Sequence, residues 1–159
     1  MSAIVANAGF ESGNIFPWAV VGAVYPNTAV ITPSNPSYSA FAGDFYSDLQ
    51  SAPGNRANTI SQHITGLVPG TNYTVSVQAL STSNSNGANY CSAGISTGVK
   101  NQTIGIAQAS PAPEQWGELS GWYVADGTED VLNLWAGCTF SGSSYTGHVL
   151  FDEVSFVEV

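Results

Sequence analysis

Apolar and polar residues alternate in short runs along the chain, and clusters of Gly, Pro, Asn and Ser separate these runs. Alternation with a period of two is typical of strands with one buried face, and no stretch shows a convincing helical period. The sequence therefore predicts an all-β fold. We expect strands at residues 4–10, 18–24, 29–32, 39–42, 57–65, 72–80, 90–97, 102–106, 117–124, 130–138 and 149–157.

The clearest of these strands follows a turn at Pro69-Gly70. Proline fixes φ and glycine accepts a positive φ, so the pair suits the middle of a type II turn. Beyond it, every second residue of 73–79 is apolar, and the residues between them are polar and include Ser76 and Gln78. This strand is predicted to bury one face in a β-sandwich.

Two later strands each carry a tryptophan on the side opposite their apolar residues. Trp122 lies in the strand at 117–124, and Trp135 lies with Asn133 in the strand at 130–138. Because successive side chains of a strand point to opposite faces, both tryptophans are predicted to face outward.

The length of 159 residues fits one domain, predicted over 1–159, and neither a linker nor an internal repeat divides it. Two basic residues stand against 11 acidic ones, for a net charge of −9. Nucleic acid binding is effectively excluded, because phosphate contacts need clustered Lys and Arg. Anionic membranes and acidic glycans are disfavoured for the same reason, whereas neutral sugars and divalent cations stay plausible. No apolar run is long enough to span a membrane.

Charged residues make up only 8% of the chain, and Ser, Thr, Asn and Gly take their place, which is typical of secreted surfaces. Met1 runs straight into the first strand pattern without a signal peptide. The protein is therefore either cytoplasmic, or Met1 replaces a removed signal. The composition favours the second reading, with an extracellular or cell-wall location. The triplets starting at Asn72 and Asn101 match the acceptor pattern for N-glycosylation.

Cys91 and Cys138 are the two cysteines of the chain. Cys138 points inward by parity, and Cys91 does so if its strand neighbours Ala93 and Ile95 share its face. A disulfide between them would close a loop of about 48 residues and contribute roughly 3–4 kcal/mol. The alternative is two buried free thiols.

The two ends of the chain carry matching acidic motifs. Glu11 lies in the first predicted strand region, and Asp152 opens the last one, 141 residues later. These carboxylates can converge only if the terminal strands lie side by side, and a hard cation such as calcium is one reason to place them there. The alternative is that both are solvated residues at strand ends or turns.

Several stretches together match a known family in order and spacing. They are residues 7–13 with Pro17-Trp18, 37–40, 60–74, Gln115-Trp116 leading into 119–121, the two cysteines, and 151–155. On these stretches the whole chain resembles the cellulase-C-type carbohydrate-binding modules, the group of families four, nine and twenty-two. It looks closest to the stand-alone fungal domains of that type.

The resemblance implies a β-sandwich jelly roll of two antiparallel sheets with one structural calcium. Glu11 and Asp152 would be the side-chain ligands of that calcium. Backbone carbonyls near Gly9 and in the 35–38 loop would complete its shell, which agrees with the six to eight oxygens that calcium takes.

The resemblance also implies a sugar site on the outer, concave face of one sheet. Sugar recognition needs a flat aromatic surface and polar groups for the hydroxyls. The outward residues that meet this need are Trp122, Trp135, Gln78, Asn133 and Ser76. The expected ligand is a neutral polysaccharide such as a β-glucan, xylan or cell-wall glycan. Alternatively, a loop or a second copy of the protein covers either tryptophan. Trp18 and Trp116 are expected in the core.

Two other functions are alternatives to carbohydrate binding. A structural or adhesive cell-surface protein could use the same fold for protein–protein or self-association. A small glycoside hydrolase would need paired carboxylates, but the acidic residues between 114 and 130 punctuate turns, where they are ordinary. Neither histidine lies in a zinc or nucleophile motif. The sequence therefore predicts a non-catalytic binding protein.

Overall fold

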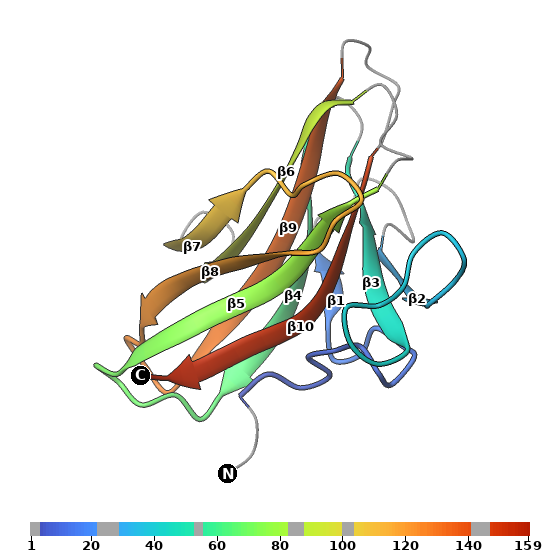
Figure 1. Ribbon diagram of the computed structural model, residues 1–159. Helices are drawn as coiled ribbons and strands as arrows, with labels where there is room; N and C mark the ends of the chain where they lie inside the picture. The colour runs from blue at the N-terminus through green and yellow to red at the C-terminus, as the bar shows by residue number, and fades with distance from the viewer. Residues whose placement is uncertain (1–3, 22–28, 53–55, 83–87, 100–103, 141–146) are drawn as a thin grey trace.

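The computed structural model describes residues 4–21, 29–52, 56–82, 88–99, 104–140 and 147–159, with the side chains of residues 88, 89 and 140 left aside (Figure 1). Every named element is a strand, and the strands form two five-stranded antiparallel sheets packed face to face. The predicted all-β sandwich is therefore confirmed. Among the described residues, there is no helix that could cross a membrane.

The first sheet has the order β1-β4-β9-β6-β7. Its strands are β1 (Ala19–Val21), β4 (Asn58–Thr65), β9 (Glu129–Phe140), β6 (Ala88–Thr97) and β7 (Ile104–Ala109). The second sheet has the order β2-β3-β10-β5-β8. Its strands are β2 (Ala29–Pro33), β3 (Phe45–Gln50), β10 (His148–Glu158), β5 (Asn72–Ser81) and β8 (Gly117–Val124).

The inner faces of the two sheets form the main core. Alternate residues of each strand point into it, as the sequence pattern predicts for a half-buried strand. On β9, Leu132 and Leu134 are fully buried, and on β5, Val75 and Val77 are too. Trp18 is 2% exposed, which confirms its expected core position. Phe10 packs against it, with ring centroids 5.9 Å apart.

A second, smaller cluster lies on the outer face of the second sheet. Tyr46, Leu80 and Leu150 are buried there, and Trp116 is among the half-buried residues that cover them. Trp116 packs edge-on against Tyr46, and its indole N–H donates to the carbonyl of Ser39 at 3.0 Å. Trp116 is therefore part of this outer cover and not of the central core.

The predicted strand at 4–10 is wrong, because this segment consists of bends and turns. Asn7 has φ 48° and Phe10 has φ 58°, conformations that interrupt an extended strand. The segment still runs beside the last strand, since the N–H of Val154 donates to the carbonyl of Ala8 at 3.0 Å. The terminal segments thus lie side by side, as the sequence predicted.

A second error concerns the region of residues 39–50. Residues 39–42 form no strand, and the real strand, β3, was missed. β3 is buried on both faces, and three of its residues, Ser47, Asp48 and Gln50, are polar, so its sequence lacks the alternation of a half-buried strand. Leu49 lies in the main core and Tyr46 in the outer cluster.

The disulfide between Cys91 and Cys138 is present, with an S–S distance of 2.05 Å. The two residues are directly opposite in the register of β6 and β9. They are 6% and 1% exposed. The inward parity predicted for both cysteines is therefore confirmed, and the bridge ties two central strands of the first sheet.

Candidate functional site

The two outward tryptophans lie on different sheets. Trp135 is on β9, on the outer face of the first sheet, and Trp122 is on β8, on the outer face of the second. These outer faces are the opposite sides of the sandwich (Figure 1). No single surface contains both residues, so the expectation of joint stacking by the two tryptophans is corrected.

The indole of Trp135 packs directly against a glycine of the neighbouring strand. Gly94 of β6 is its partner in the register. A Cβ built on Gly94 would lie 2.4 Å from the indole ring of Trp135, well inside van der Waals contact. A glycine in a strand often marks such a close approach. The half-buried indole therefore lies against the backbone of β6 and is held there.

Asn133 lies two residues before Trp135 on the same face. Its Oδ1 accepts the hydroxyl of Ser61 at 2.5 Å, and its Nδ2 donates to the carbonyl of Gly98 at 2.9 Å. The residue is 7% exposed. Asn133 was expected to bond a ligand directly, but its amide is already bonded at both ends. In this structure Asn133 links β9 to β4 and to Gly98, the residue that directly follows β6.

Polar side chains surround the indole along the first sheet. Thr59 of β4 is opposite Trp135, and Gln108 of β7 is opposite Gly94. Exposed Gln108 reaches Ser92 with its Nε2, 3.5 Å from the hydroxyl oxygen. These hydroxyl and amide groups flank one aromatic ring, which is the combination that a sugar ring requires.

The same face ends in a hollow of about 350 Å³ beside His63 of β4 and Glu129 of β9. The Nε2 of His63 lies 3.3 Å from a carboxylate oxygen of Glu129. Thr97 also lines the hollow, and its buried Oγ1 has no hydrogen-bond partner among the described residues. The outer face of the first sheet therefore combines a half-buried indole, polar side chains beside it and a hollow at the end of the face.

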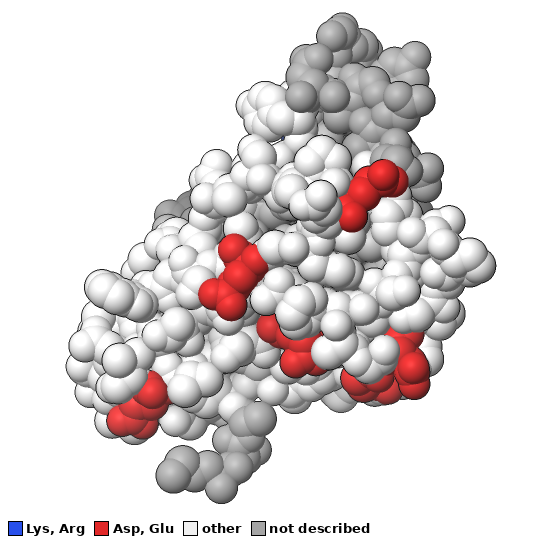
Figure 2. All heavy atoms as spheres, in the orientation of Figure 1, with Lys and Arg blue, Asp and Glu red and all other residues white. Residues whose placement is uncertain are grey.

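On the outer face of the second sheet, Trp122 is 82% exposed. Ser76 of β5 is opposite both Ser120 of β8 and Ser155 of β10. Gln78 is opposite Glu118 and Asp152. Gln78 and Ser76 thus share a face with Trp122, as their parity predicted. In Figure 2 the acidic side chains of the described residues are separate groups, and no Lys or Arg is visible among them.

Glu11 and Asp152 both contact the loop before β3. The Glu11 carboxylate accepts the N–H groups of Asp44, at 3.1 and 3.0 Å, and Phe45, at 3.0 Å. Asp152 accepts the N–H of Ala42 with its Oδ2 at 3.1 Å. One short loop therefore links the two carboxylates that the sequence singled out.

Gly9 lies beside the irregular part of β10, where the register with β5 shifts between Asp152 and Ser155. A Cβ on Gly9 would lie 2.6 Å from a carboxylate oxygen of Glu153 and 3.7 Å from Oδ1 of Asp152. Glu153 has φ 48°. Sequence reasoning missed Glu153, although it follows Asp152 directly.

Asp152 is a fully buried carboxylate. Burial raises its pKa to about 6, although the N–H groups of Ala42 and Glu153 partly offset the effect. Burying an anion is costly without a compensating cation. In the part of the chain that the structure describes, no three His, Cys, Asp or Glu side chains form a metal-binding group. The oxygen donors here therefore suit calcium only if backbone carbonyls or water complete the shell.

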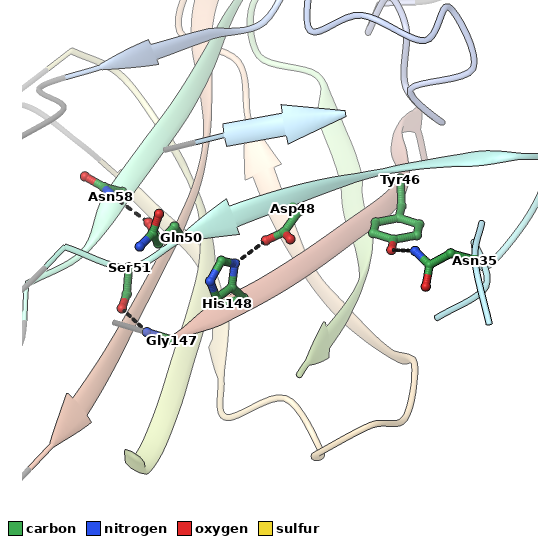
Figure 3. A network of polar contacts seen from close by, with 8 residues as sticks. All are labelled: Asn35, Tyr46, Asp48, Gln50, Ser51, Asn58, Gly147 and His148. Carbon is green, nitrogen blue, oxygen red and sulfur yellow. Dashed lines mark hydrogen bonds and ion pairs between the residues drawn. The ribbon is translucent and has the colours of Figure 1, made fainter. Parts of the chain in front are cut away.

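A separate group of polar contacts ties the other end of the second sheet to its neighbours (Figure 3). His148 of β10 and Asp48 of β3 approach to 2.7 Å between Nδ1 and Oδ1. The hydrogen bond with Asp48 raises the pKa of His148, and burial opposes this effect. Nearby, the N–H of Gly147 donates to Ser51 Oγ at 2.9 Å. These contacts fix loops and strand ends.

Comparison with known proteins assigns the family. The model of the carbohydrate binding domain family CBM_4_9 matches residues 2–135, which is most of the chain. The protein belongs to this family, and it is a carbohydrate-binding module, a non-catalytic type of domain. No curated protein matches the sequence.

Solved structures of other carbohydrate-binding modules share the fold. TmCBM61 in complex with β-1,4-galactotriose superposes with a TM-score of 0.72 at 14% identity, covering 100% of both chains. The CBM22-2 xylan-binding domain of Paenibacillus barcinonensis Xyn10C gives 0.66 at 14% identity, covering 96% of this chain and 98% of that one. The CBM22-1–GH10 modules of Clostridium thermocellum Xyn10B with xylohexaose give 0.64 at 18% identity, covering 96% and 28%. At these identities the likeness concerns the fold.

Proposed function

We propose that this module binds a neutral polysaccharide on the outer face of the first sheet, with Trp135 as the stacking surface. The observation that carries the proposal is the close packing of Trp135 on Gly94. A Cβ built on Gly94 would lie 2.4 Å from the indole ring. A ring held in one orientation loses little freedom when a sugar stacks on it. The neighbouring hydroxyl and amide groups of Thr59 and Gln108 would bond the sugar hydroxyls.

The charge of the protein supports a neutral ligand. The chain has a net charge of −9 and only two basic residues, so a polyanionic glycan would be repelled. Among the structural relatives, TmCBM61 is in complex with β-1,4-galactotriose, the CBM22-2 domain is a xylan-binding domain, and the Xyn10B modules are complexed with xylohexaose. We expect a ligand of this chemical class. Kinship with stand-alone fungal domains stays a prediction.

Two single substitutions, compared with each other, test the site. A polysaccharide array would first identify a ligand, and titration calorimetry would then compare W135A with W122A, a matched loss of one outward tryptophan on the other sheet. Loss of a buried stacking contact should weaken W135A about 10- to 100-fold. W122A should bind as the parent does. Full affinity in W135A with loss in W122A would move the site to the second sheet.

We also propose that a calcium ion stabilises the junction of the first segment and β10. Asp152, Glu11 and the carbonyl of Gly9 are the proposed ligands, and Glu153 is a further oxygen donor at that place. The support is the burial of Asp152 without a cationic partner in the described contacts. Calcium added to EDTA-treated protein should raise Tm, and D152N should lose most of that rise. An identical Tm with calcium and with EDTA would refute the proposal.

Secretion is part of the same proposal. The disulfide between Cys91 and Cys138 supports it, since such bridges persist in oxidising compartments. The low content of charged residues agrees with it. Detection of the mature protein in culture medium or cell wall, with the bridge intact, would test the location. A reduced pool confined to the cytoplasm would contradict it.

A further inference from the structure

Asn72 lies exposed at one end of the second sheet, where the interior strand β5 begins. It is the first residue of β5, directly after the turn at Pro69-Gly70, and its side chain is exposed. Among the contacts of the described residues, none is a hydrogen bond of the Asn72 side-chain amide. Thr74 follows two positions later on the same face, which completes the acceptor triplet for N-glycosylation.

Exposed apolar side chains gather next to Asn72. Trp122, Val124 and Val157 are 82%, 51% and 57% exposed, and together they are called the Trp122 stripe below. Val124 is directly opposite Asn72, while Trp122 and Val157 are opposite Thr74 on its two sides. The stripe therefore flanks the acceptor triplet, on one side of Asn72 and on both sides of Thr74, on the outer face of the second sheet.

An exposed apolar stripe on a polar face needs an explanation. The next row across the sheet consists of Ser120, Ser76 and Ser155, and the row after it consists of Glu118, Gln78 and Asp152, so both rows are polar. Directly opposed and diagonal residues on antiparallel strands lie about 5–8 Å apart, which is within the span of one or two sugar rings. A glycan on Asn72 can therefore reach Trp122 without any change of the backbone.

We propose that Asn72 carries an N-linked glycan whose first sugars cover the Trp122 stripe. In the glycosyl transfer that attaches this glycan, the side-chain nitrogen Nδ2 of Asn72 bonds to the anomeric carbon of a lipid-linked oligosaccharide. The bond from that carbon to the lipid diphosphate breaks, the diphosphate leaves, and the amide nitrogen loses one proton. The apolar C–H face of the first sugar then stacks on Trp122. This inference rests on the secretion proposed above, but not on the glycan-binding face.

Peptide mapping of protein secreted from a eukaryotic host behind a secretion leader tests the modification. The chain has one Arg and one Lys, so trypsin after reduction gives fragments 1–56, 57–100 and 101–159. The triplets at Asn72 and Asn101 then fall in different fragments. Enzymatic deglycosylation in water enriched in the heavy oxygen isotope converts an occupied Asn to Asp with a labelled carboxylate oxygen, and so reads each site separately. Asn101 itself lies outside the described residues.

Labelled Asp at position 72 is the expected result. N72Q and T74V should remove the glycan from fragment 57–100, while T74S, which preserves the triplet, should retain it. An unmodified fragment 57–100 from secreted, folded parent protein overturns the proposal. So does a glycan on this fragment that persists in both N72Q and T74V.

Quenching of tryptophan fluorescence by acrylamide tests whether the glycan covers Trp122. Trp122 fluorescence should be quenched more strongly in N72Q than in the glycosylated parent, and W122F should abolish that difference. Equal quenching of N72Q and the parent would overturn the covering of Trp122. Binding to polysaccharide should persist in N72Q, because Trp135 is on the other sheet. If neither protein binds any polysaccharide, the proposed function fails while the mapping result for Asn72 still stands.

Discussion

Removal of the bridge between Cys91 and Cys138 should lower stability by an amount that the topology sets. The double substitution C91A/C138A suits the test, because both positions are buried and alanine leaves no unpaired polar group. The two residues face each other on β6 and β9 and are separated by 47 positions in the sequence.

The magnitude follows from the entropy of the closed loop. For a loop of this length, the chain-entropy relation gives about 4 kcal/mol at 25 °C. Domains of this size are stable by about 5–15 kcal/mol, so the variant should fold with a much smaller margin. For a domain of about 150 residues, each kcal/mol shifts Tm by about 2–4 °C, which predicts a fall of about 8–16 °C.

Urea unfolding followed by tryptophan fluorescence provides the measurement, with calcium held constant. The free energy of unfolding should fall by about 4 kcal/mol. The m-value should rise, because an unfolded chain without the bridge exposes more surface. Parent protein unfolded with a reductant is the control and should match the variant. A loss below about 1 kcal/mol with an unchanged m-value would refute the entropic reasoning.

Two further predictions concern the first sheet and the end of the second. Adding a methyl group with G94A should displace Trp135 and weaken polysaccharide binding by about 2- to 10-fold in titration calorimetry. G105A, on β7, is its control, because a Cβ there meets no atom of the described residues within 4 Å. Equal affinities of G94A and G105A would refute the role of Gly94 in holding the indole. Since Asp48 raises the pKa of His148, their contact should stabilise the fold fully below about pH 6.5 and less as pH rises through the folded-state pKa. Urea unfolding of the parent and D48N at pH 5.5 and 8.0 should therefore show the larger difference at pH 5.5; a larger one at pH 8.0 would contradict the assignment.

Periodicity predicted the strands whose two faces differ. β5, β8 and β9 alternate between core and solvent, so their inward residues and both outward tryptophans followed from parity. β3 did not follow, because it is covered on both faces and contains the buried Ser47. The segment at 4–10 has the composition of a strand, but positive φ values at Asn7 and Phe10 make it a bent cover.

In the candidate sites, features that depend on neighbouring residues could be predicted from the sequence, whereas features that depend on pairing between distant segments could not. Parity placed Trp122 and Trp135 outward, but parity carries no information about which strands share a sheet. That depends on pairing between distant segments, and it separated the two residues. Glu153 was missed because its proximity to Gly9 depends on an irregularity in β10. Gly94 carried the available signal, as a glycine inside a predicted strand.

The position of β10 has a consequence for how the molecule reaches its native state during synthesis. This strand lies between β3 and β5, so the centre of the second sheet is supplied by residues 148–158. A nascent chain can pair β6 with β9 earlier, but β3 and β5 have no partner between them until β10 leaves the ribosome. Such non-local pairing is slow to form and leaves strand edges open meanwhile. Chaperone dependence should therefore concentrate on the second sheet, and truncation before residue 148 should yield insoluble chains.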